Sequence, residues 1–385
     1  MRPGRAGWVV AALLPVAVAG AARADETSGT PTAEAAVQAE RLAPPMRSFT
    51  LLGVGDLLAE ASVNRAAAAA APTGVRYDFA RLLAPIAPII GAADLAICHM
   101  ETPITAPGGK VGFIGRSAYG SSVLGAPHEV AGDLRRVGFD RCSTASNHSW
   151  DLTAEGIRTT LEALDAADLG HAGTARTPAE AAVQVFEVNG VKVAHLSYAR
   201  NSNTGFPREA WRLNRIASAA DVARDAATAR ALGAEVVVVS LHVFIEMQKV
   251  PHSSDRALVN AIAAQAAPEV LLVTGPHVPQ PMERVGPTLV WWSLGNFISG
   301  MGIPGRGKYE DQRTLDGLMA TVRLTERPDH TWSAEPATVL LCHALANRYV
   351  YPGIAAQRDM SLQPIVRAQV KACVMRSAWL PMTLS

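Results

Sequence analysis

From residue 48 onward, short apolar runs alternate with longer amphipathic stretches in which alanine is frequent. The apolar runs have the length of buried strands and are rich in valine, leucine and isoleucine. They cover residues 48–56, 94–101, 139–148, 235–242, 269–275 and 288–298. The stretches between them are of helical type, at 127–138, 152–168, 221–233 and 253–267, with a proline-interrupted one at 79–90. This alternation predicts an α/β fold whose central strands are mostly parallel.

Two further segments predict antiparallel strands. Asn189-Gly190 lies between two strand-like runs within residues 183–199, and this dipeptide is a strong hairpin signal. Residues 317–325 and 333–343 have the pattern of a late antiparallel pair. We therefore expect a mixed or two-sheet arrangement. After residue 47 no segment has the composition of a linker that would divide the chain.

The N-terminal segment has the pattern of an export signal. Arg2 and Arg5 precede an apolar run over residues 8–20, and Ala22-Arg23-Ala24 is a small-x-small cleavage site. This predicts a signal peptide over residues 1–24, cut near Ala24, and a periplasmic or extracellular protein. The alternative is an uncleaved anchor, but the run is short for a membrane span and contains a proline. Residues 25–46, polar and rich in alanine and proline, predict a flexible lead-in.

Charge and aromatic content argue against a nucleic-acid partner. The formal net charge is +1, and removal of the three arginines of the predicted leader takes it to −2. A nucleic-acid binder needs a basic face, and single-strand binders also use aromatic stacking platforms. Aromatic residues are only 5% of this chain, whereas 49% are hydrophobic, enough for a sizeable core.

Export changes how the four cysteines are interpreted. They lack CxxC spacing, which argues against a zinc knot. In an oxidising compartment up to two disulfides can form. Cys342 and Cys373 are the expected pair because both lie in the C-terminal segment. Cys98 and Cys142 lie in apolar strand-like runs, where a bond and two buried free thiols remain equal alternatives.

Polar residues able to bind a metal follow several predicted strands. Asp56, Glu101, Asn147 with His148, and His242 stand at strand ends, and His277 comes just after residues 269–275. Loops converge at the carboxyl edge of such sheets, where binding sites form. Carboxylate, amide and imidazole ligands suit Mn, Zn, Fe or Mg. A carboxylate from Asp56 or Glu101 could bridge two cations, and such a pair can generate a hydroxide nucleophile for phosphoryl transfer.

Several short segments also match the motifs of a known family. They are Gly55-Asp56, Glu101-Thr102-Pro103-Ile104-Thr105, Ser146-Asn147-His148-Ser149-Trp150-Asp151, Leu241-His242 with Glu246, Gly275-Pro276-His277-Val278-Pro279-Gln280-Pro281 and Ser293-Leu294-Gly295-Asn296-Phe297. In this order and spacing, residues 48–299 resemble the bacterial capsule-synthesis family of CapA type (poly-γ-glutamate biosynthesis protein PgsA), a branch of the calcineurin-like metallophosphoesterase superfamily. The resemblance implies two mixed β-sheets sandwiched between helices, in a domain over residues 47–345 followed by a C-terminal extension over 346–385.

The resemblance also implies a role for each matching residue. Asp56, Glu101, Asn147, His242 and His277 would hold one or two divalent cations, expected to be Mn, Zn or Fe. His148 would act on the substrate as general acid or charge stabiliser, and Asp151 would hold its other ring nitrogen. Asn296 and Glu246 would contact or orient substrate groups.

The chain departs from the family pattern at three of these segments. In one, Leu241-His242-Val243-Phe244 stands where the family has Leu-His-Trp-Gly, so the tryptophan and glycine are lost. His99-Met100-Glu101 stands where the family has Asn-Leu-Glu, and the segment around His277 is two residues shorter and has one histidine rather than two. The missing histidine removes an imidazole ligand, for which His99 is a possible replacement.

Two functional interpretations follow from the resemblance. The first is an exported metal-dependent hydrolase of a phosphoester, or of a linkage in an anionic surface polymer such as poly-γ-glutamate. The second is a catalytically degenerate accessory or polymer-binding module for synthesis or export of that polymer. Either would have the polymer or a small phosphoester as its ligand and a membrane-bound polymer synthase complex as a possible partner.

Overall fold

The computed structural model describes residues 46–385 except 244, 304, 306, 382–383 and 385. The predicted signal peptide and nearly all of the predicted lead-in therefore lie outside the described residues. Residues 46–385 cluster into one compact unit, so the C-terminal residues 346–385 belong with the rest. Among the described helices, none combines the length and the apolar composition that crossing a membrane requires.

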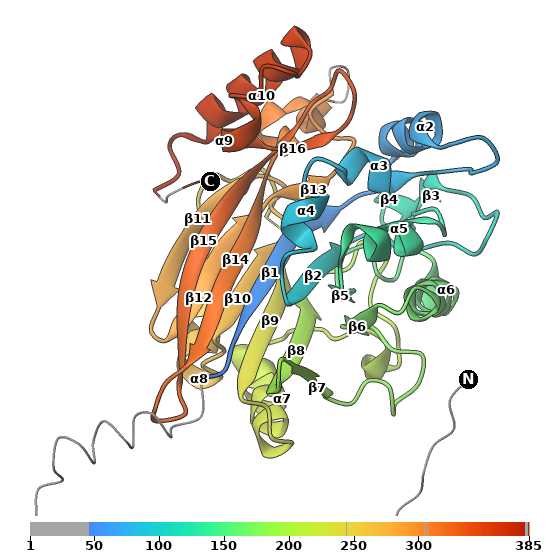
Figure 1. Cartoon of the computed structure of the whole chain (residues 1–385). Helices are drawn as coiled ribbons and strands as arrows, with labels where there is room; N and C mark the ends of the chain where they lie inside the picture. The colour runs from blue at the N-terminus through green and yellow to red at the C-terminus, as the bar shows by residue number, and fades with distance from the viewer. Residues whose placement is uncertain (1–45, 244, 304, 306, 382–383, 385) are drawn as a thin grey trace, which may run out of the picture. The chain divides into compact units, whose positions relative to one another are not determined.

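Two mixed sheets form the centre of the unit (Figure 1). The first has the order β16-β15-β14-β1-β2-β5-β6, with β13 paired to β1 off this path. Its strands are β1 (Ser48–Leu57), β2 (Leu95–Met100), β5 (Arg141–Ser143), β6 (Gly170–Ala172), β13 (Asn296–Ile298), β14 (Asp316–Glu326), β15 (Trp332–His343) and β16 (Val350–Pro352). The second has the order β11-β12-β10-β9-β8-β7. Its strands are β7 (Val185–Val188), β8 (Val191–Ala199), β9 (Val236–His242), β10 (Val270–Thr274), β11 (Pro279–Val285) and β12 (Thr288–Leu294).

Helices cover the outer faces of both sheets (Figure 1). Beside the first sheet lie α2 (Ala61–Ala70), α3 (Phe79–Leu83), α4 (Ala87–Ile90), α5 (Val130–Val137) and α6 (Thr153–Ala166), and beside the second lie α7 (Ala219–Ala231) and α8 (Ser253–Gln265). The remaining elements are the hairpin β3 (Gly112–Arg116) and β4 (Ser122–Gly125), the helices α9 (Gly353–Ala356) and α10 (Pro364–Ser377), and 3-10 turns at Ala210–Arg212, Gly307–Glu310 and Gln312–Leu315. The predicted α/β fold of two mixed sheets between helices is confirmed.

Strand β1 shows why the central runs are apolar at every position. Phe49 and Leu51 pack into the layer between the sheets, whereas Leu52 and Val54 pack against the helices. A strand covered on both faces needs apolar side chains in both directions. Parallel pairing runs from β1 through β2 and β5 to β6 in the first sheet, and from β8 through β9 and β10 to β12 in the second. Antiparallel strands lie on the β14 side of the first sheet and at both edges of the second.

Two predicted elements differ from the observed ones. The run 139–148 is a strand only over β5, because Ser149 turns the chain after Thr144. Its Oγ donates to the Thr144 carbonyl at 2.6 Å and accepts from the Ser146 amide at 2.7 Å. The stretch 79–90 is divided into α3 and α4, since Pro85 and Pro88 interrupt the helical hydrogen bonds. The weakly patterned α2, β3, β4, β6, β11, β16, α9 and α10 were not predicted.

All four cysteines are paired. The expected Cys342–Cys373 disulfide is confirmed, and it joins β15 to α10 with Cα atoms 5.8 Å apart. Cys98–Cys142 joins β2 to β5 at directly opposed positions with Cα atoms 4.4 Å apart. This settles the alternative that the sequence left open in favour of a bond.

We predict that replacing both Cys342 and Cys373 by serine lowers the free energy of unfolding by roughly 3–4 kcal/mol. The bond closes a loop with a sequence separation of 31, and its loss gives the unfolded chain back that conformational freedom. Urea unfolding measures the change. The control is Met375→Ser, an exposed position on the same helix. An unchanged urea midpoint in the double variant would contradict the prediction.

Candidate metal centre

The polar residues predicted at strand ends meet at one end of the two sheets. Asp56 lies near the end of β1, His99 in β2 and Glu101 directly after it. His242 ends β9, and His277 lies three residues after β10. The inner strands of both sheets are parallel, so their carboxyl ends carry these side chains to the same place. All five are at least 97% buried.

Asp56 lies at the centre of this group. In the first sheet its neighbours are His99 on β2 and Asn296 on β13. From the second sheet, the amide of Gly275 donates to both carboxylate oxygens of Asp56 at 3.2 Å. A Cβ at Gly275 would lie 2.0 Å from the Val243 carbonyl, and its φ of +102° favours glycine. Glycine is therefore required for this approach between the sheets.

Asp56, His99 and His242 form the first of two groups with the geometry of a metal site. His99 Nε2 lies 3.7 Å from Asp56 Oδ1 and 3.1 Å from His242 Nδ1. Ser143 Oγ holds the other nitrogen of His99 at 2.7 Å, and Thr274 Oγ1 contacts His242 at 3.0 Å. The structure thus places the imidazole of His99 within ligand distance of Asp56 and His242.

Asp56, Glu101 and His277 form the second group and share Asp56 with the first. His277 Nδ1 lies between Asp56 Oδ2 at 3.1 Å and Asn296 Oδ1 at 3.0 Å. Because both of these neighbours are acceptors, Nδ1 carries a proton, and Nε2 is left facing Glu101 Oε1 at 3.8 Å. A carboxylate or carbonyl oxygen behind the ring is the usual support of a metal-binding histidine.

Glu101 provides the test of whether a cation fits. Within the described part of the chain, neither of its carboxylate oxygens has a hydrogen-bond donor, and both are buried. The side-chain oxygen of Asn147 is buried without a donor in the same way. Leaving such oxygens unsatisfied costs several kcal/mol for a charged group. A divalent cation satisfies them, and oxygen and imidazole donors suit one.

The charges in this buried space shift the pKa values strongly. Burial raises the pKa of Glu101 well above its usual range, and the Asp56 charge adds to this. Burial lowers the pKa of His99 to about 4 and that of His242 well below its ordinary value. For His277, burial opposes the charged form, yet Glu101 and Asp56 raise the pKa to about 10. Hence His99 and His242 are neutral and ready to bind a cation, whereas His277 holds a proton.

His277 also has a strained backbone. Its φ is +59°, a left-handed conformation that is uncommon for residues other than glycine and costs roughly 1–2 kcal/mol. The contacts of its ring to Asp56 and Asn296 hold it there. Strain of this kind is typical of functional sites.

His148 lies beside the cluster and is held by two side chains. Asp151 Oδ2 accepts from His148 Nδ1 at 2.6 Å and also from the Leu124 amide at 2.8 Å. The amide nitrogen of Asn203 lies 3.2 Å from His148 Nε2. The carboxylate fixes the proton on Nδ1, so Nε2 is the nitrogen available for chemistry. Ser146 positions this loop by donating to the Glu101 carbonyl at 2.7 Å.

A cleft of about 680 Å³ opens onto this end of the sheets. Glu101, Asn147, His148 and His277 reach its floor. Its walls also carry Glu60, Arg65, Arg116, Asn203, Glu246 and Tyr309. The volume is typical of a small-molecule site, and an open cleft also admits a segment of a polymer.

Two residues implied as substrate contacts have different positions. Glu246 lines the cleft, where a substrate can reach it. Asn296 is fully buried and absent from the cleft lining, and its amide donates to the Thr314 carbonyl at 3.0 Å. Of the two roles implied for Asn296, this position fits the orienting one, since its side chain is engaged in holding His277.

Sequence reasoning missed several residues of the site. Ser143 and Thr274 end β5 and β10, so the strand-end signal that indicated His242 also applies to them. Arg65 and Arg116 have no distinguishing pattern. Asn203 lies in an irregular segment, and its amide donates to the Asn147 carbonyl at 2.8 Å. Only the folded chain places it beside His148.

Comparison with known proteins agrees with this geometry. The family described as Bacterial capsule synthesis protein PGA_cap matches residues 50–301. The chain belongs to this family. The matched range contains every residue of the cluster, together with His148, Asp151 and Asn296.

The curated relatives cover part of the chain. It is 26% identical over 219 residues to the PGA biosynthesis protein CapA of Bacillus subtilis (strain 168), covering 56% of each protein. It is 27% identical over 184 residues to the Capsule biosynthesis protein CapA of Bacillus anthracis, covering 46% of this chain and 44% of the relative. The chain thus spans about half the length of the curated relatives it matches.

Solved structures with a similar arrangement include phosphoesterases. The calcineurin-like phosphoesterase YfkN from Bacillus subtilis has a TM-score of 0.46 at 11% identity, covering 86% of this chain and 98% of that one. The 5'-nucleotidase precursor from Thermus thermophilus has a TM-score of 0.43 at 12% identity, covering 86% and 59% respectively. The family assignment rests on the sequence match.

We predict opposite effects of Glu101→Gln on metal affinity and on the stability of the metal-free protein. Removing a residue that only hydrogen-bonds to a metal ligand typically weakens metal binding by roughly 10–100-fold. Because Glu101 would bind the metal directly, its loss should weaken Mn²⁺ binding by more than this. It should also stabilise the chelated protein by about 1–3 kcal/mol. In the unfolded chain Glu101 is ionised at neutral pH, whereas in the folded protein burial opposes that ionisation, and glutamine removes this cost of folding. Calorimetric titration and urea unfolding measure the two effects. Glu162→Gln, on the exposed side of α6, is the control, and a destabilised chelated Glu101 variant would refute the interpretation.

Metal binding should release protons and strengthen as pH rises. The raised pKa of His277 keeps that ring protonated at neutral pH, so a cation competes with protons in the cluster. Each proton displaced makes the affinity rise about tenfold per pH unit below the pKa of that group. Titrations of Mn²⁺ in buffers of different ionisation enthalpy count the protons, and His277→Asn should release fewer. Affinity independent of pH between about 6 and 9 would contradict this.

Proposed function

We propose that the protein is a metal-dependent hydrolase that cleaves a phosphoester or another polar linkage of an anionic surface polymer during its biosynthesis. The observation that carries the proposal is the buried cluster around Asp56, with an unsatisfied Glu101 carboxylate, at the floor of a cleft that also presents His148. A purely structural role does not account for buried oxygens of Glu101 and Asn147 that have no hydrogen-bond donor among the described residues.

Two cation positions are consistent with the ligand groups. Asp56, His99 and His242 would hold one cation, and Asp56, Glu101 and His277, with Asn147 near them, would hold the other. A divalent ion bound there supplies a water nucleophile at neutral pH and neutralises charge on a phosphoryl or acyl oxygen. The ion is proposed to be Mn, Zn or Fe, since the mixed oxygen and imidazole donors suit these metals.

His148 is proposed to manage the proton of the leaving group. Its Nε2 faces the cleft, and the Asp151 carboxylate behind Nδ1 stabilises the imidazolium. In the structure Nε2 faces the side-chain amide donor of Asn203 and carries no proton. To act as the acid, the ring would first take up a proton from solvent on Nε2 in place of that contact. It would then give this proton to the leaving oxygen as the bond breaks, and return to the neutral form whose Nδ1 proton Asp151 holds. Asn203 limits rotation of the ring from the other side.

Two arginines among the mixed charges of the cleft walls, which also carry Glu60 and Glu246, are suited to a negatively charged substrate group. Arg65 and Arg116 both line the cleft, and arginine binds carboxylates and phosphates through paired donors. Together with the names of the relatives, this supports an anionic polymer, poly-γ-glutamate among the candidates, or a small phosphoester as ligand. Export after cleavage near Ala24 and cooperation with a membrane-bound polymer synthase complex complete the proposal.

We predict that His148→Ala lowers turnover of an aryl phosphate by about 10²–10⁴-fold without loss of bound metal, the usual contribution of a general acid. Asp151→Asn should act in the same direction, and Asp56→Ala should lose both metal and turnover. Metal analysis and steady-state kinetics with added Mn²⁺ measure these effects. His330→Asn is the matched control, because that histidine is exposed and its positive φ is one that asparagine tolerates.

The same experiment separates the hydrolase from a binding module. A protein with bound metal that retains anionic polymer but turns over neither polymer nor aryl phosphate supports a polymer-binding accessory. A chain that binds no metal at all contradicts the proposed function in both forms.

A further inference from the structure

The layer between the two sheets is apolar at its centre but contains charged and polar side chains near the edge formed by β5, β6 and β8. Beneath β1 and β2 it is filled by apolar side chains such as Leu51 and Ile97. At the edge the equivalent space holds Arg141 and His195, which are 8% and 4% exposed. A buried arginine in this position must be compensated, because burial of an unpaired charge is costly.

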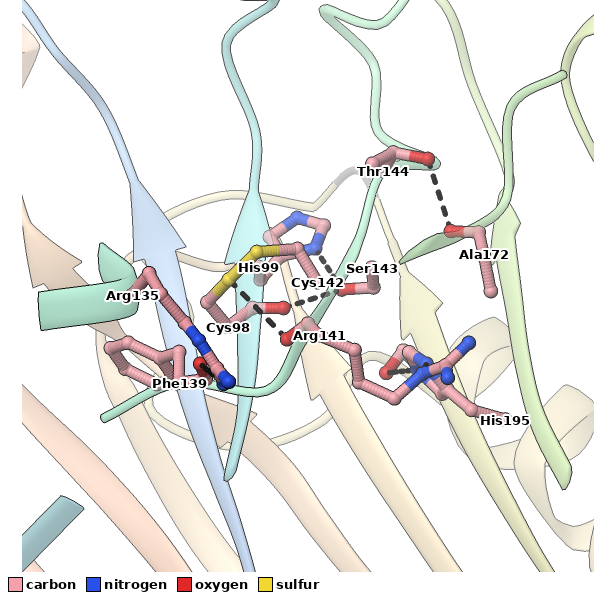
Figure 2. The surroundings of a disulfide bond; sticks show 11 residues. Cys98, His99, Arg135, Phe139, Arg141, Cys142, Ser143, Thr144, Ala172 and His195 are labelled. Carbon is pink, nitrogen blue, oxygen red and sulfur yellow. Dashed lines mark hydrogen bonds between the residues drawn. A yellow bond between two sulfur atoms is a disulfide. The ribbon is translucent and has the colours of Figure 1, made fainter. Parts of the chain in front are cut away.

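Arg141 is fixed in one orientation (Figure 2). Its Nε donates to His195 Nδ1 at 3.2 Å, and its Nη2 donates to the His171 carbonyl at 3.1 Å. The guanidinium carbon lies 4.0 Å from the centre of the Phe186 ring, which covers one face. Gly170 leaves room for the group, since a Cβ there would lie 2.9 Å from Nη1.

His195 cannot neutralise this charge. Its Nδ1 accepts from Arg141, so the proton is on Nε2, which lies 2.9 Å from Ser240 Oγ. Burial lowers the pKa of His195 well below its usual value, and the neighbouring arginine adds to this. The ring is therefore neutral. Burial also lowers the pKa of Arg141, to about 10, so the guanidinium is still charged at neutral pH.

The nearby carboxylates are committed to other cations. Glu180 is paired with Arg176, whose Nε lies 3.0 Å from it. Asp225 is held by Arg224 at 3.0 Å and by the Tyr198 hydroxyl at 2.7 Å. In the described part of the chain no carboxylate forms an ion pair with Arg141.

Beside Arg141 there is a pocket of about 290 Å³. Its lining includes Arg141, His171, Thr174, Gln184, His195 and Asn214, and it shares no residue with the cleft above the metal centre. The amides of Gln184 and Asn214 supply further donors to this lining. The lining also includes Glu180, Asp225 and Arg224, but Glu180 is paired with Arg176 and Asp225 with Arg224. Arg141 is therefore the lining cation that has no ion pair among the described residues, in a space of small-molecule size.

We propose that this pocket is a second binding site, for a small molecule bearing an oxyanion, a carboxylate or phosphate group, with Arg141 as its anchor. The oxyanion supplies the counter-charge that the chain itself does not, through charge-assisted hydrogen bonds from the guanidinium. The site is independent of the proposed hydrolysis.

The test is calorimetric titration of sodium phosphate, and in parallel sodium acetate, into the full chain against sodium chloride of equal ionic strength. Each titration is made on the protein as purified and after chelation, because phosphate also binds metal ions. Binding that persists after chelation is expected to weaken about tenfold or more in Arg141→Met. Gly170→Ala should weaken it too by crowding the guanidinium. Arg284→Met, which removes an exposed arginine that lines neither the pocket nor the cleft, should leave it unchanged.

The two anions distinguish the ligand class. Phosphate alone indicates a phosphorylated ligand, acetate alone a carboxylate, and both support a general oxyanion site. If Arg141→Met does not fold, the test uses Arg141→Lys and Gly170→Ala. Both variants keep a positive charge in the pocket but change how that charged group can contact the anion. The proposal is overturned if the chelated wild-type chain binds neither anion above chloride, or if the variants at Arg141 and Gly170 bind as the wild type does.

Discussion

The burial of the Asp56 carboxylate is the constraint on which the rest of the site depends. A fully buried negative charge needs donors or cations on every side. In this protein they come from both sheets: the Gly275 amide and His277 from the second, and the neighbouring strand position of His99 from the first. Burial alone would raise the pKa of Asp56, but the hydrogen bond from His277 and the electrostatic effects of His277, His242 and His99 together lower it below its ordinary value. The two sheets are thus joined through this one ionised group.

The neighbouring Glu101 differs from Asp56 in that the fold supplies no hydrogen-bond donor to its carboxyl group among the described residues. Its carboxyl group is as deeply buried as Asp56 but lacks donors among the described residues, and its pKa is raised where that of Asp56 is lowered. The two neighbouring carboxyl groups therefore favour opposite protonation states: Asp56 favours the ionised form and Glu101 the protonated form. Both groups are fully buried, so the difference arises from their neighbours: Asp56 has a hydrogen bond from His277 and nearby histidines, whereas Glu101 faces the Asp56 charge. A site of this kind binds protons when empty and exchanges them for a cation.

The interior between the sheets contains two polar regions of different charge. The carboxylates around Asp56 form a candidate cation site, whereas the guanidinium of Arg141 lines a pocket suited to an anion. Strand β5 takes part in both, because Ser143 supports His99 while Arg141, two residues earlier, faces the second pocket. The Cys98–Cys142 disulfide ties β5 to β2 between these two residues (Figure 2). It holds both regions on one rigid pair of strands.

The amino-acid sequence by itself determined the α/β class, the hairpin at Asn189-Gly190, the late strand pair and the strand-end positions of Asp56, Glu101 and His242. These follow from local patterns, since burial on both faces of a strand demands apolar residues and the carboxyl edge of a parallel sheet gathers the polar ones. Only the tertiary structure decided that Cys98 bonds Cys142, that Asn296 is buried behind His277, and that Asn203 reaches His148. Each of these depends on the distance between segments remote in the chain, and no local periodicity encodes that distance. The second pocket at Arg141 also depends on tertiary structure. The guanidinium can be recognised as unpaired only from the folded protein, in which the neighbouring carboxylates Glu180 and Asp225 pair with other arginines.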